Sequence, residues 1–228
     1  MHNTGLSKVS SRVTVQDGVY EQLRHALMWG QFEPDQVTTI ASLAAEFGTS
    51  HMPVREALRR LAAEKGLEIG RSGSARVPAV SRERLDDLCR ARKALEGLAT
   101  ELAAERLSDE EIEHCLKLAR EHQALGIDGQ VYEMLRKNQE FHFAIYEKSG
   151  SEVLPQMIET LWLRFGPYMR MLSDLVKQQI DAGTIHPYST YHYEMIDSFR
   201  KGDGKTAAAL MVKDIEATQA LLQDMCPA

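Results

Sequence analysis

Two arginines with helical spacing, Arg55 and Arg59, carry the first chemistry that the sequence suggests. Four residues apart in a helix, their side chains lie one turn apart on the same face. On a helix in the major groove of DNA, a guanidinium can donate two hydrogen bonds to guanine, and neighbouring cations can hold phosphates. The alternative is that Arg55 forms an ion pair with an acidic group inside its own domain. Arg60, by contrast, is expected to be solvated or to contact another domain.

The elements around these arginines predict a helix-turn-helix unit. Apolar residues recur at helical spacing through three segments, and Gly48 falls in the tight turn between the second and the third. Ser50 is expected to cap the third helix with its hydroxyl group. Segments Leu67–Ile69 and Ala75–Val77 can pair as a small hairpin, the wing. The three predicted helices are Val15–Trp29, Ile40–Phe47 and Ser50–Lys65.

The distribution of charge agrees with this prediction better than the total does. The net charge is −6, which by itself argues against a nucleic-acid-binding protein. Residues 1–80 hold nine Lys/Arg and eight Asp/Glu, a balance of +1, which leaves −7 for residues 81–228. Within residues 48–77 there are six basic and three acidic residues. Positive charge is therefore concentrated locally, as a phosphate-binding element requires.

The rest of the chain, after Ser81, is predicted to be helical throughout. Ser108 to Glu111 has the pattern of a capping box, and Asp203 is expected to cap the last helix. The pair Gly166-Pro167 is expected to kink or break the helix that contains it. The predicted fold is mainly α, with an N-terminal winged helix-turn-helix and a small β-hairpin wing followed by an all-α antiparallel helical bundle. The two units are expected to cover residues 1–79 and 80–228.

The segment Phe47–Leu61, which reads FGTSHMPVREALRRL, resembles the recognition helix of the GntR family of regulators. The stretch from Tyr20 to Pro34 and the wing ending at Ala75–Val77 resemble the same family. The resemblance implies that the unit binds double-stranded DNA and that Arg55 reads a base. Further candidates for DNA contact are Ser50, His51, Arg59, Ser72, Gly73 and Ser74.

The second unit resembles the helical FCD domain of the FadR-like branch of that family. The resemblance rests mainly on segments 92–96 (RKALE) and 138–142 (NQEFH) and on His192. In the family, an aspartate and a histidine four residues apart hold a metal ion together with two later histidines. The corresponding positions in this chain are Asn138, His142, His192 and Asp214.

These four residues still supply two imidazoles and two oxygen donors. That set suits a divalent metal ion such as zinc, nickel or manganese, with positions left open for a ligand or water. Asn138 and His142 lie one turn apart on a predicted helix, so both can point inward. The amide is a weaker donor than the carboxylate it replaces. The alternative is a hydrogen-bonded polar core around a metal-free pocket.

The resemblance implies a small organic acid as the effector. Arginine is the natural bidentate partner of a carboxylate, and Arg92 and Arg164 are candidates for that contact. Tyr191 belongs to a group of tyrosines near His192, at least one of which is expected to face the pocket.

The sequence thus predicts a cytoplasmic, homodimeric, ligand-responsive transcriptional regulator, with repression relieved by ligand as the favoured direction. No segment is long and apolar enough to span a membrane, and the first residues lack the apolar stretch of a signal peptide. The protein is not expected to be an enzyme. Two other functions remain open: a metal-dependent helical enzyme that acts on a small acid, and a DNA-architectural protein with a vestigial pocket.

Overall fold

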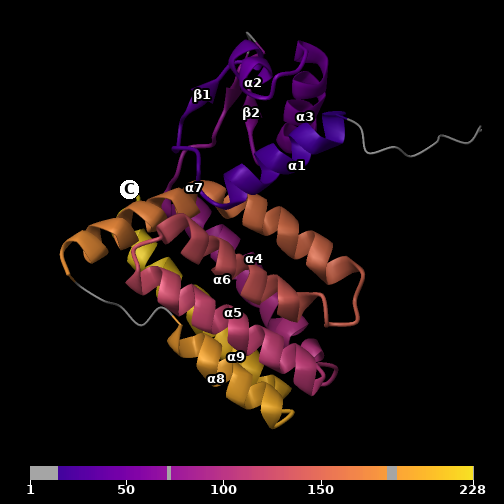
Figure 1. Cartoon of the computed structure of the whole chain (residues 1–228), viewed down its shortest axis with the longest axis vertical. Helices are drawn as coiled ribbons and strands as arrows, with labels where there is room; N and C mark the ends of the chain where they lie inside the picture. The colour runs from indigo at the N-terminus through magenta and orange to yellow at the C-terminus, as the bar shows by residue number, and fades with distance from the viewer. Residues whose placement is uncertain (1–14, 71–72, 184–188, 228) are drawn as a thin grey trace, which may run out of the picture.

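The computed structural model describes residues 15–70, 73–183 and 189–227. Figure 1 shows two units, a smaller one built from the N-terminal third and a helical one below it. In the smaller unit, the described residues form three helices and three short strands. They are α1 (Val15–Met28), β1 (Val37–Thr38), α2 (Ile40–Glu46), α3 (His51–Ala63), β2 (Glu68–Ile69) and β3 (Ala75–Arg76).

The predicted helix-turn-helix is confirmed, because the periodic apolar residues of α1 and α3 form one core. Leu23 and Leu27 of α1 and Leu58 and Leu61 of α3 are all almost completely buried. Ser50 does occupy the N-cap position of α3, but its hydroxyl makes no capping hydrogen bond. That part of the prediction was wrong, and the side chain stays exposed at the start of the helix.

The wing forms as predicted, and it is joined by a strand that the sequence analysis did not anticipate. Strands β2 and β3 pair antiparallel, with Glu68 opposite Arg76. Strand β1 pairs with the other edge of β3, where Val37 also lies opposite Arg76. The sheet order is therefore β1-β3-β2. Two residues are too few for a strand pattern, so only the pairing with β3 reveals β1.

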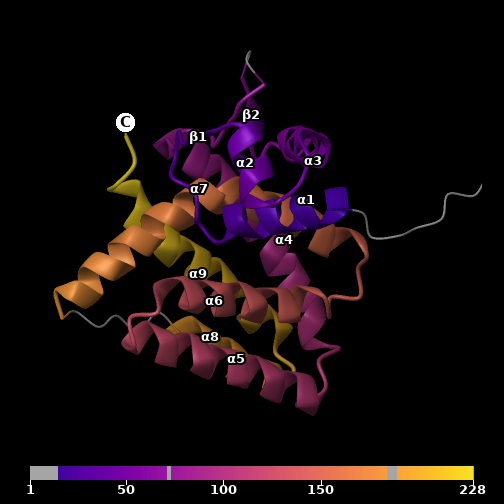
Figure 2. The same ribbon diagram turned by 45° about the horizontal axis from the view of Figure 1, so that its top comes forward.

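The described residues of the second unit form six helices. Ser108 and Glu111 form the predicted capping box at the start of α5, and the side chain of Asp203 accepts a hydrogen bond from the Thr206 amide at the start of α9. Figure 2 shows α5, α6 and α8 running beside one another, and α4 packs along α9. The helices are α4 (Arg82–Ala104), α5 (Asp109–Ile127), α6 (Val131–Tyr146), α7 (Val153–Asp181), α8 (Thr190–Arg200) and α9 (Gly204–Gln223).

Helix α7 corrects the prediction of a break at Gly166-Pro167. It runs without interruption through both residues, although proline removes one backbone donor. Packing explains why the helix continues. A Cβ atom on Gly166 would lie 2.3 Å from the carbonyl oxygen of Leu27, so the glycine lets α1 and α7 approach closely. Tyr168 is fully buried, and its hydroxyl donates to the Ser81 carbonyl at 2.9 Å. These tertiary contacts outweigh the local helix-breaking tendency.

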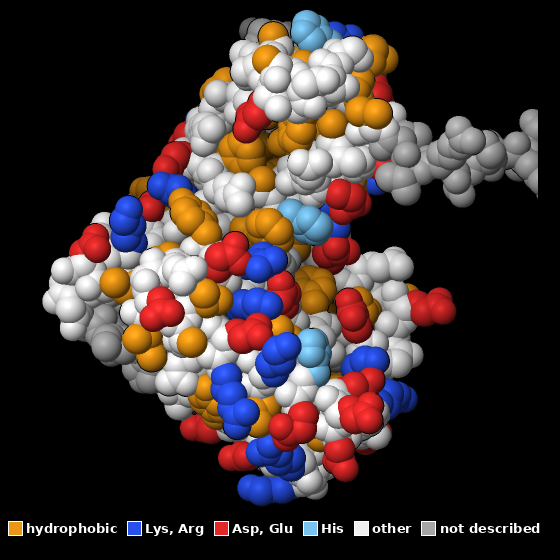
Figure 3. All heavy atoms as spheres, viewed as in Figure 1, with side chains coloured by type: hydrophobic (Ala, Val, Ile, Leu, Met, Phe, Trp, Pro, Cys, Tyr) orange, Lys and Arg blue, Asp and Glu red, His pale blue; other side chains and the backbone are white. Residues whose placement is uncertain are grey.

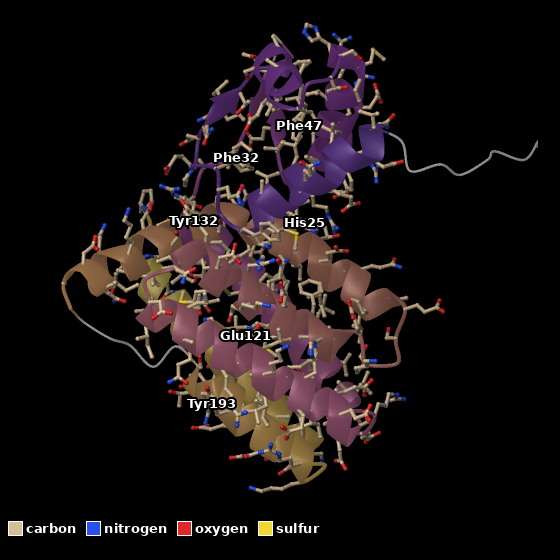
Figure 4. All side chains as sticks on the ribbon, viewed as in Figure 1. His25, Phe32, Phe47, Glu121, Tyr132 and Tyr193 are labelled. Atoms are coloured by element: carbon tan, nitrogen blue, oxygen red, sulfur yellow. The ribbon has the colours of Figure 1, made fainter. Side chains whose placement is uncertain are left out.

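The two units meet across an extensive polar and apolar junction, where α1 lies on α7. Arg24 of α1 is buried and pairs with Glu159 of α7. The Trp29 indole, just after α1, donates to the side-chain oxygen of Gln139 on α6. Figure 4 shows His25 and Tyr132 at this junction. The DNA-binding candidates and the ligand-binding candidates therefore belong to structures that touch directly.

Candidate nucleic-acid interface and metal centre

Helix α3 leaves Arg55 exposed to solvent. Within the described part of the chain, Arg55 has neither an ion pair nor a hydrogen bond, so the internal pairing considered above does not occur. Its guanidinium keeps all of its donors available. A bidentate contact with a guanine edge needs this freedom.

The two neighbouring arginines differ from Arg55. Arg59 is exposed and forms an ion pair with Glu56, with 2.8 Å between the guanidinium nitrogen and the carboxylate oxygen. Arg60 pairs with Asp17 of α1 at 3.0 Å, and its guanidinium carbon lies 3.6 Å from the centre of the Tyr20 ring. Arg60 therefore links α3 to α1 through contacts with Asp17 and Tyr20.

The remaining DNA-contact candidates surround the start of α3 and the wing. Ser50 and His51 are exposed beside the first turn of α3. Gly73 and Ser74 are half-buried at the wing, and Gly73 has a φ of 77°, which favours glycine. Ser72 lies outside the described residues.

The helical unit contains a cavity that opens to solvent and encloses about 590 Å³, its mouth included. The walls come from α4, α5, α6, α7 and α9, and they combine apolar with polar side chains. The polar and aromatic lining residues are Arg92, His122, Asn138, His142, Trp162, Phe165, Asp214 and Thr218.

Three of the four predicted metal ligands come together, and two of them, His142 and Asp214, line this cavity. Each of His142, His192 and Asp214 offers one ligand atom, and these three atoms lie within 4.8 Å of one another. The His142 Nε2 to Asp214 Oδ2 distance is 3.4 Å, and the His192 Nε2 to Asp214 Oδ1 distance is 3.8 Å. The fourth, Asn138, lies on the cavity wall.

The donor set fits a divalent ion. His192 is fully buried, yet neither of its ring nitrogens has a hydrogen-bond partner. An unpaired polar group of this kind costs free energy unless a ligand satisfies it. Burial also lowers the pKa of His192 well below its usual value, so the ring is neutral and keeps a lone pair. Metal binding requires that protonation state.

Arg92 lines the cavity but already has a partner. Its Nε donates to Glu96 Oε1 at 2.6 Å and its Nη2 to Oε2 at 3.2 Å, and both side chains are buried. The guanidinium also lies against the rings of Trp162 and Phe165. Its charge is therefore neutralised by the protein itself.

The same carboxylate connects to the metal candidates through a tyrosine. Tyr146 donates its hydroxyl proton to Glu96 Oε2, and the oxygen lies 3.0 Å from His142 Nδ1. Burial, followed by the Glu96 charge, raises the pKa of Tyr146 well above its usual value, so the hydroxyl stays protonated.

The other two effector candidates do not line this cavity. Arg164 is half-buried, and its Nε lacks a partner. It follows Trp162 by two positions and precedes Phe165 by one, so it lies on a different face of α7. Tyr191 is half-buried on α8. Its neighbour His192 faces inward instead.

Comparison with known proteins identifies both units. The model of the bacterial regulatory proteins of the gntR family matches residues 15–77, and the FCD domain model matches residues 87–217. The chain is also 34% identical to the HTH-type transcriptional regulator McbR of Escherichia coli, over 77% of this chain and 78% of that protein. The chain belongs to the GntR family, in the branch with an FCD domain.

Other comparisons agree with this assignment. The solved structure of E. coli McbR/YncC has a TM-score of 0.86, with 26% identity over 94% of this chain and 99% of that one. The HTH-type transcriptional repressor GlaR of E. coli is 31% identical over 66% of this chain and 70% of that protein. These relatives are transcriptional regulators, which confirms that this GntR protein is a regulator and not an enzyme.

Sequence reasoning missed His122, which lies on α5 and is 97% buried. Its Nδ1 lies 2.8 Å from the Ser189 hydroxyl, and its ring centre is 5.2 Å from that of His192. Burial lowers its pKa to about 4. The only available indication was that His122 follows the apolar face of Cys115 and Ala119 at helical spacing, which also describes an ordinary core histidine.

None of the described helices combines the length and the apolar character that a membrane span requires.

Proposed function

We propose that this GntR regulator is a repressor that a small organic acid releases from DNA, with the acid bound at a divalent metal ion in the FCD domain. The observation that carries the proposal is the buried His192. Neither of its ring nitrogens has a hydrogen-bond partner among the described residues, and the ring lies beside Asp214 and His142. A polar core without a metal would leave both nitrogens unsatisfied, and such groups are rare in native proteins.

DNA binding by the first unit is the output that the acid would change. Arg55 would contact a base, while Arg59, Ser50, His51 and the wing residues 72–74 would contact phosphates or neighbouring bases. GntR regulators bind operators and usually act as dimers. A homodimer would place two α3 helices in successive major grooves of a palindrome, about 34 Å apart. We assign residues 1–79 to this unit and residues 80–228 to the sensing and dimerising unit, both acting in the cytoplasm.

His142, His192 and Asp214 would hold the metal, and Asn138 can add its amide oxygen. Nitrogen and oxygen donors of this kind suit zinc, nickel or manganese. When bound, the ion would supply a positive charge and open coordination positions for a carboxylate oxygen.

The effector would lie in the cavity beside these ligands. Arg92 is neutralised by Glu96, so it cannot supply the net positive charge that a carboxylate needs. Trp162 lines the cavity, and its indole N–H has no partner, so it can donate to an oxygen of the acid. His122 can do the same. Arg164 and Tyr191 remain proposed effector contacts that require side-chain movement.

The junction between the units would transmit the signal. Gln139 accepts a hydrogen bond from Trp29, which follows α1, and it is the residue after Asn138 on α6. A shift of α6 on ligand binding would therefore act directly on the DNA-binding unit. Small rigid-body changes of this kind can displace paired recognition helices.

A two-step experiment tests the proposal. The full chain is stripped with a chelator, and its thermal unfolding is measured with zinc, nickel or manganese alone, then with a panel of small mono- and dicarboxylic acids. Binding to DNA selected from a random library is then measured by fluorescence anisotropy with and without each stabilising acid. We expect one metal to raise Tm and an acid to weaken DNA binding. No stabilisation by any metal contradicts the metal site, and tighter DNA binding contradicts release.

A further inference from the structure

Behind His142 lies a continuous chain of hydrogen bonds that begins at a charged arginine. Arg92 donates to both oxygens of Glu96, Tyr146 donates to Glu96 Oε2, and His142 Nδ1 lies 3.0 Å from the Tyr146 oxygen. Arg92, Glu96 and Tyr146 are each at least 95% buried. Very little of these side chains is therefore exposed to water.

Counting protons along the chain assigns the direction of each bond. A carboxylate held by a guanidinium offers only acceptor atoms, and a tyrosine hydroxyl has one proton. Since that proton goes to Glu96, the Tyr146 oxygen can only accept from His142. The Nδ1 of His142 must then carry a hydrogen, and in the neutral ring its Nε2 keeps an unshared pair, 3.4 Å from Asp214 Oδ2.

We infer that Arg92, Glu96 and Tyr146 are positioning residues that hold His142 in the Nδ1–H tautomer and so present its Nε2 lone pair to a divalent metal ion. The inference deepens the proposed function and rests on its metal site. In this arrangement Arg92, which the sequence suggested as a contact for the effector, instead helps to determine which ring nitrogen of His142 carries the hydrogen.

The opposite tautomer makes poorer bonds. It would place a hydrogen on Nε2, with Asp214 as acceptor at a distance of 3.4 Å, longer than a typical N–H···O bond. Tyr146 would then turn its proton toward Nδ1 and give up its bond to the Glu96 carboxylate. That bond is charge-assisted, and such bonds are about twice as strong as neutral ones. The Met211 sulfur, 3.4 Å from the Tyr146 oxygen, is only a weak alternative acceptor.

The first test is the zinc affinity of the metal-free full chain, measured by competition with a coloured chelator. We expect Tyr146→Phe to weaken binding by about 10- to 100-fold, the usual cost of losing a group that orients a metal-bound histidine. Tyr168→Phe is the matched control, because it removes another buried tyrosine hydroxyl, one that bonds the Ser81 backbone. It should leave zinc affinity unchanged. Equal affinities of wild type and Tyr146→Phe overturn the inference.

The second test reads the tautomer directly and needs no metal. Nitrogen-15 spectra of the histidine rings distinguish a protonated from an unprotonated nitrogen, and loss of signals in His142→Asn assigns the ring. We expect Nδ1 of His142 to be protonated in the metal-free wild type. In Glu96→Gln the amide oxygen should face Arg92 and its NH₂ group Tyr146, so the hydroxyl turns to His142 and the hydrogen moves to Nε2. A wild-type ring protonated on Nε2 overturns the inference.

The two tests separate this inference from the proposed function. If no metal binds but His142 carries its hydrogen on Nδ1, the metal site is wrong and the assignment of the tautomer stands. If zinc binds with the same affinity when Tyr146 lacks its hydroxyl, the metal site stands and the positioning role is wrong.

Discussion

Helices α3 and α4 each carry an arginine and a glutamate within one turn of each other, in opposite surroundings. On α3, Arg59 pairs with Glu56 while its side chain remains 65% exposed. On α4, Arg92 pairs with Glu96, and the two side chains are 6% and 0% exposed. In the first pair, Arg59 can exchange Glu56 for a phosphate at little cost in free energy. The second is fixed by burial, because separating buried charges is costly.

The same contrast holds for the two units as wholes. Helix α3 leaves Arg55 exposed and without a partner among the described residues, available to an external partner. On the helical unit, Figure 3 shows basic and acidic side chains intermixed over the visible face, and the buried arginine has an internal partner. Among the described residues of this unit, the buried polar atoms without a hydrogen-bond partner include both ring nitrogens of His192, a proposed metal ligand. The exposed charge of the first unit thus suits contact with DNA, and the buried polar groups of the second suit the proposed enclosed ligand.

The largest expected effect comes from separating the buried pair. Glu96→Ala should lower the free energy of unfolding by about 3–5 kcal/mol, because it leaves Arg92 charged and unpaired in the core. Urea denaturation of the purified chain measures the loss. Glu56→Ala, which separates the exposed pair on α3, is the control and should cost less than about 1 kcal/mol. Similar losses in both variants would remove the contrast between the pairs.

Loss of His192 should abolish stabilisation by metal. At a metal concentration 1,000 times Kd, a bound ion adds about 4 kcal/mol to the free energy of unfolding, and His192→Ala should lose that gain. Thermal unfolding with and without the stabilising metal measures it. His114→Ala changes an exposed histidine of α5 and should keep the full shift in Tm. An undiminished shift in His192→Ala would place the metal elsewhere.

Loss of Arg55 should weaken operator binding by about 1–3 kcal/mol without affecting the metal site. The side chain has no partner within the described residues, so the free energy of unfolding should hardly change. Fluorescence anisotropy on a selected DNA and on a scrambled one separates base reading from phosphate contact. Arg59→Ala should weaken binding to both DNAs to a similar extent. If Arg55→Ala did likewise, its base-reading role would be lost.

The smallest effect concerns the junction where the two units meet. Gln139→Ala removes the acceptor of the Trp29 indole and should reduce the coupling between acid and DNA binding by about 0.5–2 kcal/mol. Affinity for the acid alone should be retained. Arg136→Ala, whose ion pairs stay within α6, is the matched control. Unchanged coupling in Gln139→Ala would show that the signal crosses the junction by another contact.

Much of the fold was predictable because it depends on local patterns. Helical periodicity predicted α1 and α3, and short polar patterns predicted the caps at Ser108 and Asp203. The course of α7 through Pro167 was not predictable. A proline weakens a helix by its own geometry, whereas the close approach of Gly166 to Leu27 is a contact between residues far apart in the chain.

The amino-acid sequence by itself determined the family, the position of Arg55 on a recognition helix and the residues His142, His192 and Asp214. The resemblance of short segments to the GntR family and its FCD domain implied the roles of these residues. Only the tertiary structure decided that Arg55 has no partner within the described part of the chain, that Arg92 pairs with Glu96, and that His122 and Trp162 line the cavity. Partners of buried charges are chosen by distance in space and by exclusion of water, and neither is contained in spacing along the chain.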